Sequence, residues 1–178
     1  MKNNKSIYAV LIALVFSLIT SCNKSEKSKT MSDDTYYKEI AYCLSKCYSD
    51  VYNQSLAGKP VGYQNFTTTG PMGGSIEITG NTTQDNTNNI TTTDLVFAMN
   101  DVSYSTTSTN LNQTGSVTYK GSFSPNHNNT SHLSNSLRLS GKVTKDGVTR
   151  NVDLNTTISI NVTKTTVSAT IDGHNVNW

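Results

Sequence analysis

The sequence predicts a mainly β protein in which one amphipathic helix precedes a long antiparallel meander. Apolar residues recur at helical spacing only between residues 32 and 57. From Val61 onward, short stretches alternate apolar with polar residues and are separated by glycine or by clusters of Asn, Thr and Ser. Two Asp-Gly pairs, at 146–147 and 172–173, are favoured two-residue hairpin turns. We therefore expect a strongly curved antiparallel sheet, a barrel or half-barrel, packed on the helix. A β-sandwich is the alternative.

The segment 32–57 carries the start and stop signals of a helix. Ser32 can cap the first turn, and the two aspartates that follow complement the positive end of the helix dipole. Gly58 and then Pro60 end the pattern. We place Glu39 on the polar side of this helix. The apolar stripe, which should face the sheet, consists of Tyr37, Ile40, Leu44, Cys47, Tyr48 and Val51.

Strand signals fill the rest of the chain. The predicted strands are 61–69, 75–79, 90–106, 115–124, 133–145, 148–163, 166–171 and 174–178. The polar stretches that we expect to be loops are 80–89, 107–113 and 124–132. In the third strand the alternation changes phase at Asn100-Asp101, which indicates either a β-bulge or a tight turn. The 16 residues of 148–163 exceed the usual length of about six. Strands this long twist and coil, which is the reason to expect strong curvature.

The turns predict the register of the last four strands. Residues that face each other across a two-residue hairpin have a constant index sum, and their side chains share one face of the sheet. With turns at 146–147, 164–165 and 172–173, the apolar residues fall on a single face, which we expect to be core. The predicted pairs are Val143 with Arg150, Gly141 with Val152, Leu139 with Leu154, Val162 with Val167, Ile160 with Ala169, Ile158 with Ile171, Ala169 with Val176, and Val167 with Trp178.

Residues 1–21 have the features of a cleaved export signal. Two lysines precede an apolar run at 7–19, and small polar residues follow it. This length and these flanks are typical of a signal peptide, not of a membrane-spanning helix. The run from Leu18 to Cys22 (LITSC) resembles the lipobox of bacterial lipoproteins. The resemblance implies cleavage before Cys22 and acyl chains on its sulfur and amine, which would hold the protein to a membrane.

The mature chain would have 157 residues, the 178 of the sequence less the 21 of the signal, enough for one domain. We place this domain at 32–178, with the helix at 32–57 and the sheet at 61–178, after a flexible lipidated tether at 22–31. Without the signal's two lysines, 12 basic residues balance 12 acidic ones, so nothing favours nucleic acid as a partner. Asn23 beside the lipidation site, and a tether without an acidic cluster, favour the outer membrane facing the periplasm over surface exposure, which stays open.

Cys43 and Cys47 lie four residues apart within the predicted helix. Side chains at this spacing are about 6 Å apart on one helix face, too far for a relaxed disulfide. A metal site would need two further donors nearby, and the sequence supplies none, so we expect no metal and no cofactor. Two buried thiols at the contact between helix and sheet are the favoured interpretation, and a strained disulfide is the alternative.

No constellation typical of catalysis is present, and we expect no enzyme. The chain has no nucleophile elbow, phosphate-binding loop or calcium loop, and no carboxylate falls on the predicted apolar face of the sheet. Arg150 is the one charged residue on that face away from a turn, and Lys145 shares the face at a strand end. Both can extend to solvent at the rim. Alternatively, they form a cationic mouth for the head group of a hydrophobic ligand.

Three functions remain, in order of preference. The first is a structural or interaction module of the cell envelope, with a protein or glycan partner. The second is a periplasmic carrier of a hydrophobic ligand held between the helix and a concave sheet. The third is an enzyme with an unrecognised site. A carrier needs an unfilled apolar cavity of at least about 300 Å³. An interaction module should expose an apolar or aromatic patch, or an unprotected edge strand.

Overall fold

A computed structural model of the chain describes residues 29–88, 90–124, 129–162 and 167–178. The folded unit is Met31–Trp178. The predicted signal peptide, the lipidation site Cys22 and most of the predicted tether lie outside the described residues.

The predicted helix is confirmed, with a change of geometry near its end. Helix α2 spans Asp33–Val51, and a π-helical segment, η1, continues it through Tyr52–Leu56. Ser32 is the N-cap, and its Oγ accepts a hydrogen bond from the Thr35 amide at 3.3 Å. Gly58 follows with a φ of 81°, a left-handed conformation that glycine adopts without strain. The whole predicted apolar stripe is buried.

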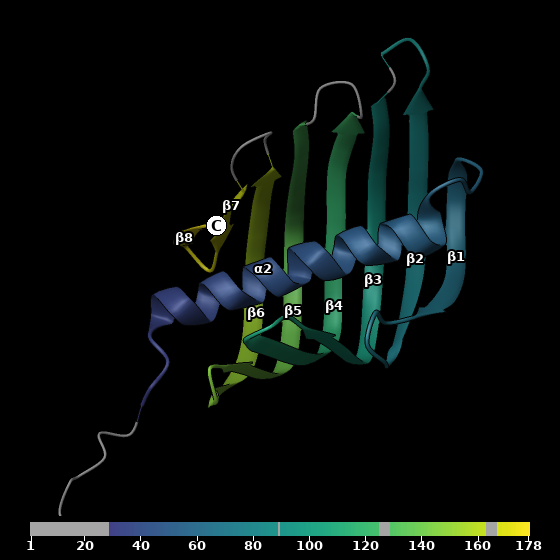
Figure 1. The fold of residues 1–178 in the computed structure, drawn as a ribbon. Helices are drawn as coiled ribbons and strands as arrows, with labels where there is room; N and C mark the ends of the chain where they lie inside the picture. Colours follow the sequence, from purple (N-terminus) through teal and green to yellow (C-terminus); the bar gives the residue numbers. More distant parts are fainter. Residues whose placement is uncertain (1–28, 89, 125–128, 163–166) are drawn as a thin grey trace, which may run out of the picture. The chain divides into compact units, whose positions relative to one another are not determined.

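Eight strands form a single antiparallel sheet in chain order (Figure 1). The strands are β1 (Gly62–Thr69), β2 (Ser75–Asp85), β3 (Ile90–Ser105), β4 (Thr109–Ser124), β5 (Asn129–Lys145), β6 (Val148–Val162), β7 (Val167–Ile171) and β8 (His174–Asn177). The meander is therefore confirmed. The described strands make one sheet, so the alternative of a two-sheet sandwich was wrong. This sheet is open, because β1 and β8 are its two edges and do not pair with each other.

The predicted register of the last four strands is confirmed wherever it is described. Leu139 pairs with Leu154, and Gly141 with Val152. The other predicted pairs across β6, β7 and β8 also form. At the end of β8, the amide of Trp178 donates to the carbonyl of Val167 at 3.0 Å, and the reverse bond is 3.3 Å. The expected turn at 164–165 lies outside the described residues.

Most of the stretches that we expected to be loops are strand. β2 continues to Asp85, β4 begins at Thr109, and β5 begins at Asn129. Asn, Thr and Ser suit the extensions of β2 and β4 because, wherever side-chain exposure is described, residues on one face of the sheet are exposed or partly exposed. The phase change at Asn100-Asp101 is a β-bulge, since the register of β3 against β4 shifts between Met99 and Val102.

Helix α2 and η1 lie across one face of the sheet and contribute one side of the core (Figure 1). At about 1.5 Å per residue, their 19 and 5 residues extend about 36 Å, close to the width of eight strands spaced about 4.8 Å apart. Where burial is described, the inner face of the sheet is mostly apolar and buried, with a few buried polar residues such as Thr93 and Gln113, and the outer face is mostly polar. The core residues of the sheet include Ile76, Ile78, Leu95, Phe97, Leu111, Val117, Leu137, Leu139, Val143 and Ile171.

Candidate functional site

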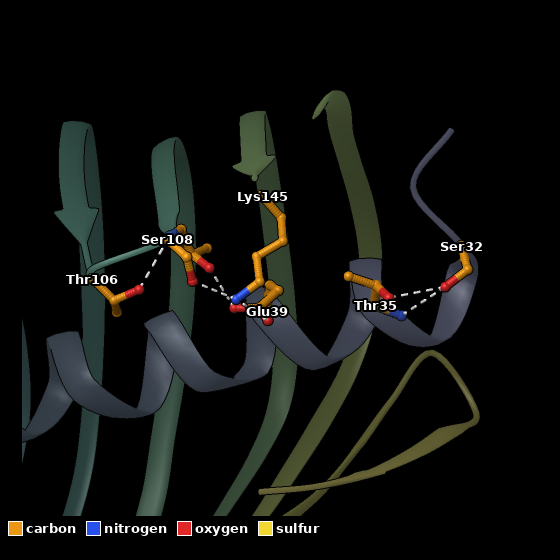
Figure 2. Close-up of polar contacts among 7 residues, drawn as sticks. Ser32, Thr35, Glu39, Thr106, Ser108 and Lys145 are labelled. Carbon is orange, nitrogen blue, oxygen red and sulfur yellow. Dashed lines mark hydrogen bonds and ion pairs between the residues drawn. The ribbon is translucent and has the colours of Figure 1, made fainter. Parts of the chain in front are cut away.

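Lys145, one of the two predicted mouth cations, is paired with a buried carboxylate of the helix. Its Nζ lies 3.1 Å from Oε1 of Glu39 and donates to Oγ of Ser108 at 2.6 Å. The second carboxylate oxygen, Oε2, accepts a 2.7 Å hydrogen bond from Thr109 Oγ1. Figure 2 shows Glu39 extending from α2 toward the ends of β4 and β5, where these partners lie. The expected exposure of Glu39 was wrong, because the two strand ends reach the flank of the helix and satisfy its carboxylate.

A surface pocket of about 310 Å³ opens beside this ion pair. It is lined by Lys38, Glu39, Tyr42, Thr106, Thr107, Ser108, Lys145 and Trp178. The rings of Tyr42 and Trp178 meet edge to face, with centroids 5.7 Å apart. Both aromatic residues are only partly buried. The pocket therefore combines two partly open rings with a fixed carboxylate and ammonium group.

Sequence reasoning identified Lys145 but missed the other residues of the pocket. Tyr42 and Glu39 lie beside the predicted stripe of the helix, and no local pattern distinguishes them from its solvent-exposed residues. Trp178 was assigned to the core face of β8; it does pack against the core and is partly buried, but its place in this pocket was not predicted. The pocket exists because a helix, a hairpin and a strand end meet, which no local signal records.

Arg150, the second predicted mouth cation, binds a different part of the helix. Its Nη1 lies 2.6 Å from Oδ1 of Asp33, and its guanidinium carbon lies 3.9 Å from the centre of the Tyr36 ring. Burial raises the pKa of Tyr36, and the neighbouring Arg150 charge opposes that rise. Lys145 and Arg150 are thus each paired with a carboxylate of α2, and these contacts hold the β5–β6 hairpin on the helix.

The β7–β8 turn holds the same end of the helix. The imidazole of His174 stacks on the ring of Tyr37, with centroids 4.0 Å apart. The Tyr37 hydroxyl donates to Oδ2 of Asp172 at 3.0 Å. Burial, followed by this hydrogen bond, raises the pKa of Tyr37. The contacts account for His174 as a packing residue.

Cys43 and Cys47 are free thiols on the buried side of α2, with 0% and 2% of their surfaces exposed. Burial raises the pKa of each thiol from 9.0 to about 12. Such thiols are almost entirely protonated near neutral pH, which makes them poor nucleophiles and poor metal ligands. Among the described residues, no group of three or more His, Cys, Asp or Glu side chains is placed to hold a metal ion.

The first edge of the sheet, β1, differs from the opposite edge. β1 has eight residues (GYQNFTTT) without a charge or a proline, and it pairs with β2 without interruption. Tyr63 in this strand and Val61 just before it are 68% and 56% exposed. β8, at the other edge, has only four residues and contacts α2. β1 is therefore a long edge without charged residues of its own and with two exposed apolar side chains, although Lys59 lies over the ring of its Phe66.

No known protein family, curated protein or solved structure matches this chain. None of the described helices is long and apolar enough to cross a membrane.

Proposed function

We propose that this chain is a non-catalytic interaction module of the cell envelope, anchored by lipid on Cys22, which binds an extended segment of a partner protein along β1. The observation that carries this proposal is the edge formed in the described sheet by the eight uncharged residues Gly62–Thr69. The partner strand would continue the antiparallel sheet on the side away from β2.

An edge strand presents backbone N–H and C=O groups that can pair with another chain. Proteins usually protect such edges with charges, proline, bulges, short strands or a covering element. β8 has two of these protections, a short length and contacts with the helix. β1 has no charge, no proline and no bulge against β2. Strand addition takes affinity from main-chain hydrogen bonds and specificity from neighbouring side chains, here Tyr63 and Val61.

The carrier hypothesis has less support. Ile40, Leu44 and Val51 of the helix, each at most 1% exposed, occupy the position between helix and sheet where a guest would lie. The described pockets, of about 310 to 420 Å³, are on the surface and are lined largely by polar residues. A carrier would also require the strong curvature of the sheet proposed from the long β6. An enzyme with an unrecognised site is the third alternative.

Lipid anchoring on Cys22, in the outer membrane and facing the periplasm, is part of the proposal. It rests on the signal-like residues 1–21 and on the lipobox resemblance of the run that ends at Cys22. Cys22→Ser should release the protein from membranes or leave an unprocessed precursor. Unchanged processing and unchanged membrane attachment would refute the anchoring.

Strand addition is tested by site-specific crosslinking in intact cells. A photoreactive residue in place of Tyr63 should give a discrete adduct with a partner protein. The same photoreactive residue in place of Ala98, an exposed position of β3, which pairs there with both β2 and β4, should give none.

Charge on the edge strand provides the matched comparison. The double variant Asn65→Lys with Thr67→Lys places charge on the exposed side of β1 and should abolish the adduct at position 63. The control is Val96→Lys with Ala98→Lys on β3, at exposed positions paired on both sides, which should leave that adduct intact. Equal loss in both double variants, or no adduct at position 63, would refute the proposal.

A further inference from the structure

We propose that the pocket beside the Glu39–Lys145 ion pair binds one or two saccharide units. This inference is independent of strand addition, because the pocket involves α2, the β3–β4 turn, Lys145 and Trp178 but no residue of β1. Its volume of about 310 Å³ falls at the small end of small-molecule sites, which begin at about 300 Å³.

Two kinds of groups in the pocket match the two kinds of surface on a sugar ring. The partly open rings of Tyr42 and Trp178 offer apolar area on which the C–H face of a pyranose can pack. The carboxylate of Glu39 and the ammonium group of Lys145 offer charge-assisted hydrogen bonds to hydroxyl groups. A polyol with an apolar face uses both, whereas a purely apolar ligand would cut the charged pair off from solvent and offer it no hydrogen bond.

The side chains of Glu39 and Lys145, which form the polar part of the pocket, are held in place by hydrogen bonds before a ligand binds. Thr109 holds one oxygen of Glu39 at 2.7 Å, and Lys145 is held by the other oxygen and by Ser108. The hydroxyl of Thr106 accepts a 3.2 Å hydrogen bond from the amide of Thr109, which closes the adjoining turn (Figure 2). A preorganised site loses less side-chain freedom when it binds, so weak individual contacts can still add up to measurable affinity.

The charges of the pocket indicate which saccharides to compare. Lys38 and Lys145 line it with Glu39, so its lining side chains carry one more positive than negative charge. Neutral and N-acetylated sugars should bind through hydroxyl and amide groups alone. Uronic acids should bind more tightly, because their carboxylate adds a charge-assisted bond to a lysine.

Trp178 makes the test direct, because it is the single tryptophan of the chain and lines the pocket. The full chain, in a detergent without a sugar head group, would be titrated with glucose, N-acetylglucosamine, glucuronic acid and their β-linked disaccharides. We expect a saturable change in tryptophan fluorescence, with glucuronic acid binding more tightly than glucose. Lys145→Met should weaken binding at least about tenfold.

Two further variants keep the outcome interpretable. Tyr42→Leu removes one ring without touching the ion pair and should also weaken binding. Lys142→Met, at an exposed position of the same strand β5, is the matched control and should bind like the unchanged chain. Circular dichroism and thermal unfolding would check that each variant is folded. The absence of a saturable change with every sugar, or equal binding by folded Lys145→Met and Lys142→Met, would overturn the proposal.

Discussion

Gln113 is a core residue whose amide has no partner among the described residues. It lies on β4, opposite Val102 on one side and Gly141 on the other, and none of its surface is exposed. In the part of the chain that the structure describes, its Nε2 and Oε1 are the two buried side-chain atoms that make no hydrogen bond. A buried polar group without a partner loses its hydrogen bonds to water and gains none.

Gln113→Leu should therefore stabilise the domain by about 1 to 3 kcal/mol, because it removes the unsatisfied amide and retains most of the side-chain volume. Chemical unfolding with urea would measure the difference. The control, Gln113→Glu, keeps the shape but places a charge at the same position, and it should destabilise the domain strongly at neutral pH. A destabilised leucine variant would show that the amide has a partner, such as a bound water molecule.

Removing either partner of the Glu39–Lys145 ion pair should lower the free energy of unfolding of the domain. Glu39→Leu leaves the ammonium group of Lys145 without its carboxylate, and Lys145→Met leaves the carboxylate dependent on Thr109 alone. Each single change should cost about 2 kcal/mol, less than for a fully buried pair because the Lys145 side chain is 25% exposed. The double variant should recover most of this loss. Urea unfolding of all four chains would measure it, and strictly additive losses would contradict the expected coupling.

At the scale of elements, the buried side of α2 makes the domain sensitive to high pH. Burial raises the pKa of Cys43 and of Cys47 from 9.0 to about 12, and that of Tyr48 from 10.0 to about 12. In the unfolded chain these groups ionise near their ordinary pKa values of 9.0 and 10.0, whereas in the folded chain they stay protonated. The folded state therefore holds more protons between about pH 9 and 12, and its stability must fall as pH rises through this window.

We expect a constant melting temperature up to about pH 9 and a steady fall above it. Cys43→Ala with Cys47→Ala should make the fall shallower. A residual slope should remain from the tyrosines whose pKa values are raised mainly by burial, Tyr36, Tyr37, Tyr48 and Tyr104. Thiol labelling provides a second measurement. In a Cys22→Ser chain only the two helix cysteines remain. They should resist a thiol reagent at about pH 8 until the domain is unfolded. Rapid labelling of the folded chain would contradict the buried position of the thiols.

The elements also show where sequence patterns succeed. The registers of β5 with β6 and of β7 with β8 could be predicted because an Asp-Gly turn fixes each index sum, and a shift by one residue would move every apolar side chain to solvent. The extensions of β2 and β4 could not be predicted. These extensions are mostly polar and contain Asn residues, which have a low strand propensity. They form strand because neighbouring strands pair with them, and a local sequence pattern does not record that pairing.

At the scale of the whole molecule, one helix covers the inner face of a wide sheet. The contacts of α2 reach β3 through β8, and η1 reaches β1 through a 2.8 Å hydrogen bond between Ser55 and Thr68. Without this segment, the apolar inner face would be open to water. The helix is therefore an essential layer of the domain.

A chain that begins at residue 58 should accordingly aggregate, or bind a hydrophobic dye and unfold without cooperativity. A chain that begins at Met31 retains the whole folded unit and should unfold at the same temperature as the full protein. Size-exclusion chromatography and thermal unfolding would compare the two. A monomeric, cooperative 58–178 fragment would show that the sheet is stable by itself.

The sequence by itself determined the helix with its cap, the antiparallel meander and the register of its last strands. These features follow from local periodicity and turn chemistry, which act over a few residues. Only the tertiary structure decided that the sheet stays open at β1, and that Lys145 and Arg150 pair with Glu39 and Asp33. Edges and ion pairs of this kind depend on which strand ends reach the helix, and that requires the packing of elements far apart in the chain.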